Sequence, residues 1–515
     1  MSSYHGVPQT RRATQRLMNC RFARLAWLII FLVAVSAGAD ATVYRVGPGE
    51  AYPEIDNVPW ESLNPGDIVE IAWRANPYLS KWVIARAGTH AQPIIVRGIA
   101  GTNGQRPVIS GDGAITRTQL NFWNEDRGVI KIGGASVPSG PGRHIVIESL
   151  EIRGAYAAYS FTDDNGNVDT YRDNAAAIFI EHGENINIRD CVLTDSGNGL
   201  FVANQSTNIT LEHSYVFGNG NVGSIFEHNT YTEAFGMTYQ FNRFGPLRSG
   251  AGGNNLKDRS AGLIVRYNWV EDGNRQLDLV DSAKFAVEQP GAYQTTLVYG
   301  NILIEHDDQG NRQMVHYGGD SGNSSQYRKG ALYFYHNTLI SERTGRSTLF
   351  RLATNDETAD VRNNIFFNAG GPNTLELAST AGIYDFTNNW ISQDYVTSFD
   401  GGFSGTVNHQ QTFSGDDPGF IDRINQDYRL NDGSAALDAA AELVPAIGTS
   451  FPIQQEYALH QQSRIRGQNG SPDLGAFEAA GQVVSPRQVP VLPVLGIAVL
   501  AFTLVSLAKS HARQF

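Results

Sequence analysis

Five short segments of the chain share one pattern, in which a polar residue that can do chemistry follows an apolar residue. The copies are Leu256-Lys257-Asp258, Leu277-Asp278-Leu279, Val315-His316-Tyr317, Phe350-Arg351-Leu352 and Leu375-Glu376-Leu377. Neighbouring side chains of a β-strand point to opposite faces, so apolar flanks inside a core place the middle residue outside. If such strands stack ~4.8 Å apart, the middle residues form one outward column. The members of this column are Lys257, Asp278, His316 and Arg351. Their amine, carboxylate, imidazole and guanidinium groups can together bind an anion and transfer protons.

More titratable side chains lie within one or two positions of this column or of an earlier copy of the pattern. That copy is Phe226-Glu227-His228, in which either polar residue can be in register. A polar column is also typical of an ordinary solvated sheet face. The diversity of the groups favours a functional site over that simpler interpretation. The additional side chains are Arg259, Tyr317, His228 and Tyr231.

A second pattern predicts the elements that position the column. An asparagine stands between apolar, strand-forming residues at positions 242, 268, 301, 337, 364 and 389, with separations of 26, 33, 36, 27 and 25 residues. Such a period indicates stacked coils, each too small to bury its own apolar face. At a bend, the asparagine amide can donate and accept along the stack while it tolerates unusual backbone angles. Asp190 and Ser214 occupy the same place in two earlier copies.

Turn signals at both ends of this region indicate one all-β domain over residues 40–480. Asn64-Pro65-Gly66-Asp67 precedes the strand-like residues 68–71, and Pro472-Asp473-Leu474-Gly475-Ala476-Phe477-Glu478 comes near the end. These phrases resemble the opening and closing segments of the right-handed parallel β-helix, the superfold of pectate lyases. The resemblance covers most of the chain and implies a solenoid. A β-propeller is the structural alternative, although its blades usually need ~40 or more residues.

The charge and the N-terminus indicate an exported protein. Lys and Arg total 39 against 51 Asp and Glu, and the net charge of −12 argues against nucleic acid as a partner. Residues 1–39 have the arginines, the apolar run and the Ala37-Gly38-Ala39 site of a signal peptide. A retained membrane anchor is the alternative, but the apolar run is short for a span of ~20 residues.

Residues 481–515 are predicted to contain a linker, a transmembrane helix and a basic tail. An apolar run from Val494 to Ala508 precedes Lys509, His511 and Arg513, which is typical of membrane insertion with the tail in the cytoplasm. The arrangement resembles PEP-CTERM sorting segments of Gram-negative envelope proteins, although the Pro-Glu-Pro motif is absent. It implies a protein at the cell envelope or surface of a Gram-negative bacterium, anchored or sorted by this helix.

Two segments resemble a motif pair of secreted bacterial β-helix proteins grouped near polysaccharide lyases: His228-Asn229-Thr230-Tyr231 and Leu256-Lys257-Asp258-Arg259-Ser260. The resemblance implies β-elimination on an acidic, uronic-acid-containing polysaccharide. That reaction needs a cation or a metal to neutralise the sugar carboxylate, and an amine or phenol to take the neighbouring proton. Lys257 is the candidate base, and Arg259 or Arg351 can hold the carboxylate. Tyr231, Tyr317 or His316 can protonate the leaving oxygen, and His228 is a further substrate-binding candidate.

No calcium cluster is evident near the column, so no cofactor is predicted with certainty, although Ca²⁺ is possible. Asp163, Asn165, Asn167 and Asp169 alternate in a loop, as oxygen ligands around Ca²⁺ can do. Gly166 stands at the wrong place for an EF-hand loop, and an ordinary polar turn is the simpler interpretation.

Two other functions remain open. A glycoside hydrolase needs two carboxylates ~5–10 Å apart, and Asp278 with Asp281 or Asp258 is the nearby supply. A non-catalytic surface protein that binds glycan or forms part of a matrix is the alternative outside enzymology. We expect a monomer in each case.

Overall fold

The computed structural model describes residues 41–307, 310–467 and 470–479. These residues lie in one compact unit that begins at Ala41. The predicted signal peptide and the predicted C-terminal helix lie outside the described residues. Within that part of the chain, no helix combines the length and the apolar character needed to cross a bilayer.

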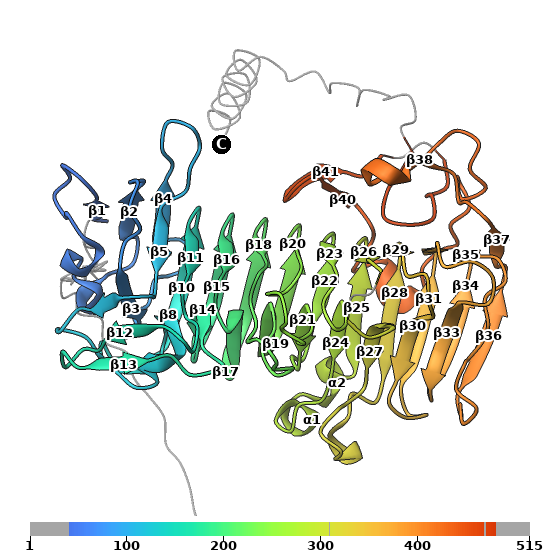
Figure 1. The fold of residues 1–515 in the computed structure, drawn as a ribbon, viewed down its shortest axis with the longest axis horizontal. Helices are drawn as coiled ribbons and strands as arrows, with labels where there is room; N and C mark the ends of the chain where they lie inside the picture. Colours follow the sequence, from blue (N-terminus) through green and yellow to red (C-terminus); the bar gives the residue numbers. More distant parts are fainter. Residues whose placement is uncertain (1–40, 308–309, 468–469, 480–515) are drawn as a thin grey trace, which may run out of the picture. The chain divides into compact units, whose positions relative to one another are not determined.

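Successive coils pair strand on strand in parallel, so the predicted parallel β-helix is confirmed and the β-propeller is excluded (Figure 1). Three ladders of strands run along the coils. Ladder 1 contains β1 (Val43–Val46), β2 (Ile68–Ala72), β4 (Ile94–Ile99), β10 (Gly142–Glu148), β15 (Gly183–Arg189), the second halves of β17 (Asn198–Glu212) and β19 (Thr230–Gln240), β22 (Ile264–Arg266), β25 (Thr295–Tyr299), β28 (Ala331–Tyr335), β31 (Thr358–Arg362), β34 (Ile383–Thr387) and β36 (Thr406–Gln410).

The other two ladders complete each coil. Ladder 2, which carries the predicted column, contains β3 (Ser80–Ile84), β8 (Gly128–Ile132), β14 (Ala176–Ile180), the first halves of β17 and β19, β21 (Leu256–Asp258), β24 (Leu277–Leu279), β27 (Gln313–Tyr317), β30 (Ser347–Leu352) and β33 (Leu375–Thr380). Ladder 3 contains β5 (Val108–Ser110), β11 (Glu151–Arg153), β16 (Val192–Thr194), β18 (Tyr215–Val216), β20 (Arg243–Phe244), β23 (Trp269–Glu271), β26 (Ile302–Glu305), β29 (Thr338–Ser341), β32 (Ile365–Asn368), β35 (Trp390–Ser392) and β37 (Phe413–Gly415).

The interior of the coils is filled by the apolar residues that flank the predicted column. Leu256 pairs with Leu277, Leu277 with Val315, and Val315 with Phe350, and all four side chains are buried. Each coil therefore stacks its apolar side chains on those of its neighbours, and burial of this apolar area stabilises the domain.

The asparagines form a continuous hydrogen-bonded stack at the bend between ladder 1 and ladder 3, as predicted. The main-chain N–H of Asn268 donates to Oδ1 of Asn301 at 2.9 Å, and that of Asn301 donates to Oδ1 of Asn337 at 3.0 Å. The same bond continues to Asn364 and Asn389 at 2.8 and 2.9 Å. A buried amide at every coil thus satisfies the main chain of the coil before it.

Two details of that prediction are wrong. The left-handed backbone angle belongs to the residue before the stack position, for example Tyr267 and His336, with φ of 56° and 52°. Asp190 has this same angle (φ 52°), and the stack position in its coil belongs to Cys191, whose N–H donates to Ser214 Oγ at 3.1 Å. Aspartate tolerates the left-handed region, which made Asp190 resemble a member of the stack.

The C-terminal segment packs on ladder 3. It contains β38 (Phe420–Asp422), β39 (Asp427–Leu430), α3 (Pro445–Gly448), β40 (Gln455–Ala458) and β41 (Gln462–Ile465), and its Tyr428 and Tyr457 pack against Trp269. Shorter elements occur between ladder strands: β6 (Ala114–Thr116), β7 (Asn121–Phe122), β9 (Ala135–Val137), β12 (Ser160–Thr162), β13 (Val168–Thr170), α1 (Phe285–Glu288), α2 (Pro290–Tyr293), and the 3₁₀ turns Ile55–Asn57, Trp60–Ser62, Glu125–Arg127, Ser324–Gln326 and Arg423–Asn425. The apolar residues of the C-terminal segment form one cluster with ladder 3 and a second, through Ile447, with ladder 1; among the described residues, neither cluster contains a residue of ladder 2.

Candidate functional site

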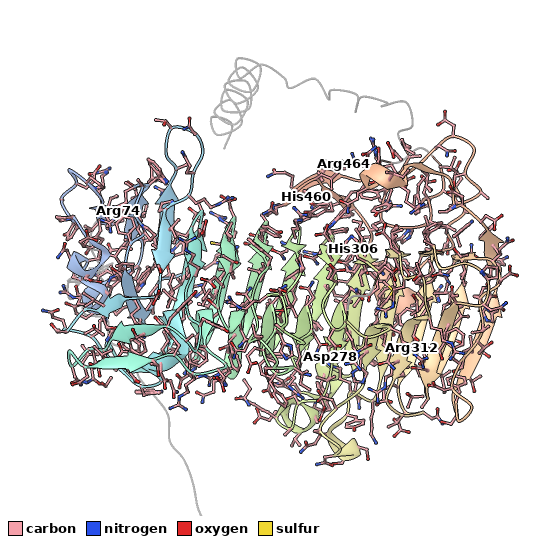
Figure 2. The ribbon with its side chains drawn as sticks, in the orientation of Figure 1. Arg74, Asp278, His306, Arg312, His460 and Arg464 are labelled. Atoms are coloured by element: carbon pink, nitrogen blue, oxygen red, sulfur yellow. The ribbon has the colours of Figure 1, made fainter. Side chains whose placement is uncertain are left out.

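The register of ladder 2 confirms the predicted column. Lys257 pairs with Asp278, Asp278 with His316, and His316 with Arg351. Figure 2 shows Asp278 on the side of the coils away from His460 and Arg464 of the C-terminal segment. The column continues past Arg351 to Ser379, so Glu376 is not its next member.

On the other side of Lys257 the column becomes aromatic. Tyr231 pairs with Lys257, Phe201 with Tyr231, and Phe179 with Phe201. The ring centroids of Phe201 and Tyr231 lie 5.0 Å apart. The residue in register is therefore Tyr231, and neither polar residue of Phe226-Glu227-His228 occupies that place. Tyr231 was named as a candidate but does not fit the sequence pattern, because in β19 it stands between two threonines and not between apolar residues.

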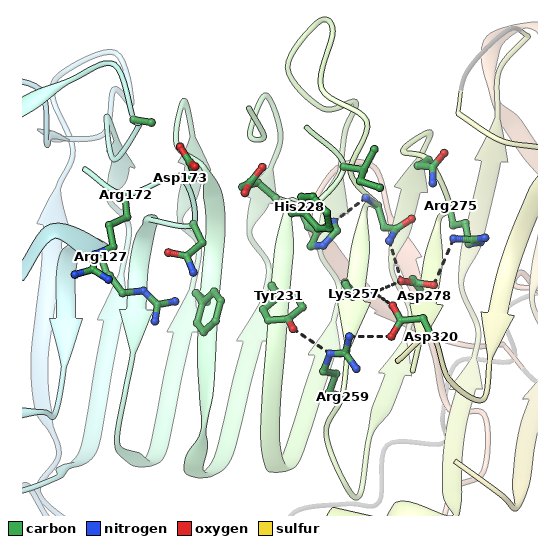
Figure 3. Close-up of a pocket in the computed structure, with 18 of the residues that line it drawn as sticks. Arg127, Arg172, Asp173, His228, Tyr231, Lys257, Arg259, Arg275, Asp278 and Asp320 are labelled. Atoms are coloured by element: carbon green, nitrogen blue, oxygen red, sulfur yellow. Dashed lines mark hydrogen bonds and ion pairs between the residues drawn. The ribbon is translucent and has the colours of Figure 1, made fainter. Parts of the chain in front are cut away.

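A groove of about 1060 Å³ runs along this face of ladder 2 (Figure 3). Lys257 lines it, with Nζ 2.6 Å from Oδ2 of Asp278 and 2.6 Å from Oδ2 of Asp320. Asp320 belongs to the loop after β27 and was not predicted. Its only sequence signal is the turn Gly318-Gly319-Asp320-Ser321-Gly322, a few residues beyond His316.

Asp320 also joins Lys257 to the second predicted cation. Its Oδ1 accepts a hydrogen bond from Nη2 of Arg259 at 2.9 Å, and Arg259 Nε donates to the hydroxyl of Tyr231 at 3.0 Å. Burial raises the pKa of Asp320, but Lys257 and Arg259 together hold it below its ordinary value. The Asp320 carboxylate thus bridges an ammonium and a guanidinium, with a phenol beside them.

Asp278 is almost completely buried and is surrounded by donors. Oδ2 accepts from Nδ2 of Asn254 at 2.8 Å, and Oδ1 from Nδ1 of His316 at 2.7 Å. Burial raises the pKa of this carboxyl, but the His316 hydrogen bond and the Lys257 charge hold it below its ordinary value. Asp278 is therefore an anion at neutral pH that fixes the Lys257 ammonium.

His316 and Arg351 support the site from behind and do not line the groove. Nη1 of Arg351 lies 3.0 Å from Nε2 of His316, and a guanidinium can only donate, so Nε2 accepts and Nδ1 carries the proton given to Asp278. Burial lowers the pKa of His316, in agreement with a neutral ring. The prediction that His316 donates a proton to substrate is wrong, because both ring nitrogens are engaged within the protein.

His228 does line the groove, as predicted. Its Nδ1 accepts the main-chain N–H of Asn254 at 2.8 Å, and its ring stacks on Tyr231 with centroids 5.6 Å apart. Burial and the charge of Lys257 lower the pKa of His228 to about 3. The neutral ring therefore carries its proton on Nε2 and can donate a hydrogen bond to a ligand.

Three predicted candidates are buried and do not line the groove. Tyr317 is fully buried on the inner face of β27, so it cannot touch a substrate there. Asp258 is likewise internal, with Oδ1 3.0 Å from Nη2 of the buried Arg328. Asp281 is buried, and its Oδ1 accepts the main-chain N–H of Asp320 at 2.8 Å. The strand alternation that puts Lys257 and His316 outside puts their neighbours inside.

The candidate calcium loop forms an ordinary turn between β12 and β13. Oδ1 of Asp163 accepts the main-chain N–H groups of Asn165 and Asn167 at 3.0 and 2.6 Å, and Asp169 Oδ1 accepts that of Thr170 at 2.8 Å. Among the described residues, no group of three or more His, Cys, Asp and Glu side chains is arranged to hold a metal ion.

No known protein family matches the sequence. No curated protein matches it either. Among solved structures, a pectate lyase, Pel9A, is similar over 86% of this chain and 98% of its own, with 11% identity and a TM-score of 0.44. An alginate lyase from Paenibacillus sp. str. FPU-7 is similar over 68% of this chain and 93% of its own, with 14% identity and a TM-score of 0.31. A GH136 lacto-N-biosidase from Eubacterium ramulus is similar over 72% of this chain and 68% of its own, with 10% identity and a TM-score of 0.41. Scores this low support no argument about the activity of this chain.

Proposed function

We propose that this protein is an exported polysaccharide lyase that cleaves a uronic-acid-containing polysaccharide by β-elimination. The observation that carries the proposal is the position of the Asp320 carboxylate, 2.6 Å from Lys257 Nζ and 2.9 Å from Arg259 Nη2. A uronate carboxylate placed there gains the same two cations. Asp320 lies on a loop, and its side chain keeps 33% of its exposure, so a substrate can displace it.

The charge of the groove supports an anionic substrate. Five cationic side chains line it against four carboxylates, although the whole chain has a net charge of −12. The groove thus has a small positive excess, and positive potential in a cleft attracts anionic ligands. The five cations are Arg127, Arg172, Lys257, Arg259 and Arg275, and the four carboxylates are Asp173, Glu227, Asp278 and Asp320.

The contacts favour Tyr231 and Lys257 for the proton transfers. Lys257 is an ammonium ion paired with carboxylates, so we propose it as the proton donor, in place of the base expected from the sequence. The Tyr231 oxygen, beside the Arg259 guanidinium, acts as a phenolate, takes the proton α to the sugar carboxylate and becomes a phenol. The electron pair of that C–H bond forms the C=C bond, the β C–O bond breaks, and Lys257 protonates the leaving oxygen. Arg259 stabilises the charge that develops on the carboxylate.

Hydrolysis fits the groove less well. The paired carboxylates that face it are Asp278 and Asp320, and both have pKa values held below the ordinary range, although burial alone raises them. A glycoside hydrolase needs one carboxyl of raised pKa to protonate the leaving group. The pair beside Lys257 contains none, and the groove carboxyl of raised pKa, Glu227, interacts with Asp173 instead. The pairs expected from the sequence, Asp278 with Asp258 or Asp281, fit poorly, because Asp258 and Asp281 are buried and do not line the groove.

The test is to incubate the purified protein with polygalacturonate, alginate and hyaluronan and to follow the ultraviolet absorbance of an unsaturated uronate. Tyr231→Phe keeps the ring and removes the proton acceptor, so we expect a loss of turnover of about 10²–10⁴-fold. Tyr52→Phe, a partly exposed tyrosine at the other end of the domain, is the matched control. New reducing ends without absorbance indicate a hydrolase, and binding without cleavage indicates a glycan-binding protein.

A further inference from the structure

The end of the groove farthest from Asp278 contains a guanidinium with two N–H groups that the described residues leave without an acceptor. Arg127 immediately precedes β8, and its Cζ lies 4.5 Å from the ring centroids of both Phe179 and Phe201. Its Nε and Nη2 are buried and have no hydrogen-bond partner among the described residues. Figure 3 shows Arg127 and Arg172 together at this end, with Tyr231 between them and Lys257.

The aromatic rings account for only part of this environment. They contact the face of the guanidinium, whereas its N–H groups point outward in the plane and need acceptors. Buried donors without acceptors are uncommon in native proteins and call for a physical explanation. Burial lowers the pKa of Arg127, and the charge of Arg172 lowers it further against the opposing effect of Glu181. An anion between the two arginines would accept hydrogen bonds from the unpaired N–H groups of Arg127 and would reduce the repulsion between the two guanidinium groups.

The neighbouring charges leave room for such an anion. Arg172 is 62% exposed in its side chain and pairs with Asp126 through one edge of its guanidinium. Asp173 and Glu227 also line this end of the groove. Burial raises the pKa of Glu227 above its ordinary value.

The register gives the separation from the reaction centre. Phe179, Phe201, Tyr231 and Lys257 belong to four successive strands, and Arg127 contacts the first two. At ~4.8 Å a strand, the Arg127 guanidinium lies ~12 Å from Lys257 along the stack. The partly exposed ring of Phe201 occupies the floor between them, where the apolar face of a sugar ring can stack.

We propose that Arg127 and Arg172 form a second anion-binding subsite, which holds the carboxylate of another acidic sugar of the same polysaccharide chain. This inference rests on the proposed function, because it places the polysaccharide in the same groove. It specifies that the substrate is a polyanion with repeated carboxylates, and that long chains bind more tightly than the shortest fragment that can be cut.

The test compares Arg127→Gln with Arg143→Gln on the purified full chain. Arg143 is an exposed arginine of ladder 1 that pairs with Glu184 and lies outside the groove. We expect Arg127→Gln to raise KM for the cleaved polymer about tenfold or more, with kcat unchanged, because one charge-assisted pair is lost. On the shortest oligouronide that is cut, KM should not change. Arg127→Lys keeps the charge without the bidentate geometry, and circular dichroism of both variants checks their folding.

Affinity electrophoresis in polygalacturonate, alginate, hyaluronan and neutral dextran separates this inference from the lyase proposal. If no polymer is cut but Arg127→Gln alone weakens retention by an acidic polymer, the subsite stands and the lyase assignment falls. If the wild type cuts a polymer and Arg127→Gln has the same KM, the subsite is overturned. If the wild type is retained by none of the acidic polymers, both are overturned.

Discussion

Replacement of Lys257 by Met is expected to destabilise the domain as well as to stop turnover. An outward side chain would ordinarily contribute little to stability, but Lys257 is only 7% exposed and Asp278 only 1%. Removal of the ammonium leaves Asp278 as a buried anion that has lost its 2.6 Å partner. Loss of one member of a buried pair costs about 3–5 kcal/mol. Asp278 keeps donors from Asn254 and His316 at 2.8 and 2.7 Å, so we expect about 2–4 kcal/mol.

The assay is urea denaturation followed by circular dichroism, for Lys257→Met, Asp278→Asn and the double variant. The double variant should lose about 2 kcal/mol less unfolding free energy than the two single variants lose together, because it no longer contains an unpaired charge. Since the pKa of Asp278 is below its ordinary value, its ion pair stabilises the fold above the unfolded-state value of ~4 and is lost as the pH falls through the lower folded-state value. The difference in unfolding free energy between wild type and Lys257→Met should therefore be largest at pH 7 and smaller at acidic pH. Equal denaturation midpoints at pH 7 would refute this reasoning.

Three further predictions concern the stack, the substrate grip and the topology. Asn301→Ala should lower the free energy of unfolding by about 1–3 kcal/mol, because a buried N–H loses its acceptor, whereas the exposed Asn103→Ala should not; equal losses would contradict the stack. Arg259→Ala should raise KM and lower kcat in steady-state kinetics, since it contacts both the carboxylate position and Tyr231; an unchanged KM would count against that grip. A reporter fused after Ala480 should be exported and one fused after Phe515 should report cytoplasm; cytoplasmic signal from the first would contradict the signal peptide.

The periodic parts of this molecule were predictable and the loops were not. Strand alternation and the asparagine period were enough to place Lys257, Asp278 and His316 on one column, because each follows from repetition along the chain. Asp320 and Arg127 reach the groove from loops or turns beside the strands, whose lengths follow no period. Contacts of that kind depend on three-dimensional proximity that no local pattern encodes.

The errors at individual residues have similar causes. Asp258 was a hydrolase candidate because it adjoins the column in the sequence, but it faces the interior of the coils, where Arg328 satisfies it. Tyr317 was assigned to the substrate because it adjoins His316, although adjacency in a strand means the opposite face. His316 itself is in the predicted column, and only its contacts with Asp278 and Arg351 show that it orients the carboxylate instead of meeting a sugar.

The one-strand-per-coil register gives the groove a fixed scale. The separation between Lys257 and the two rings that contact Arg127 is set by main-chain hydrogen bonds, because Phe201 and Phe179 lie two and three strands from Lys257 in ladder 2. Deletion of one coil between them would bring the two sites closer by ~4.8 Å while leaving the chemistry of each unchanged. The distance between the two sites therefore changes only in steps of one coil. Gain or loss of a coil would match the sites to a polymer with a different spacing of charges, with no change in either site.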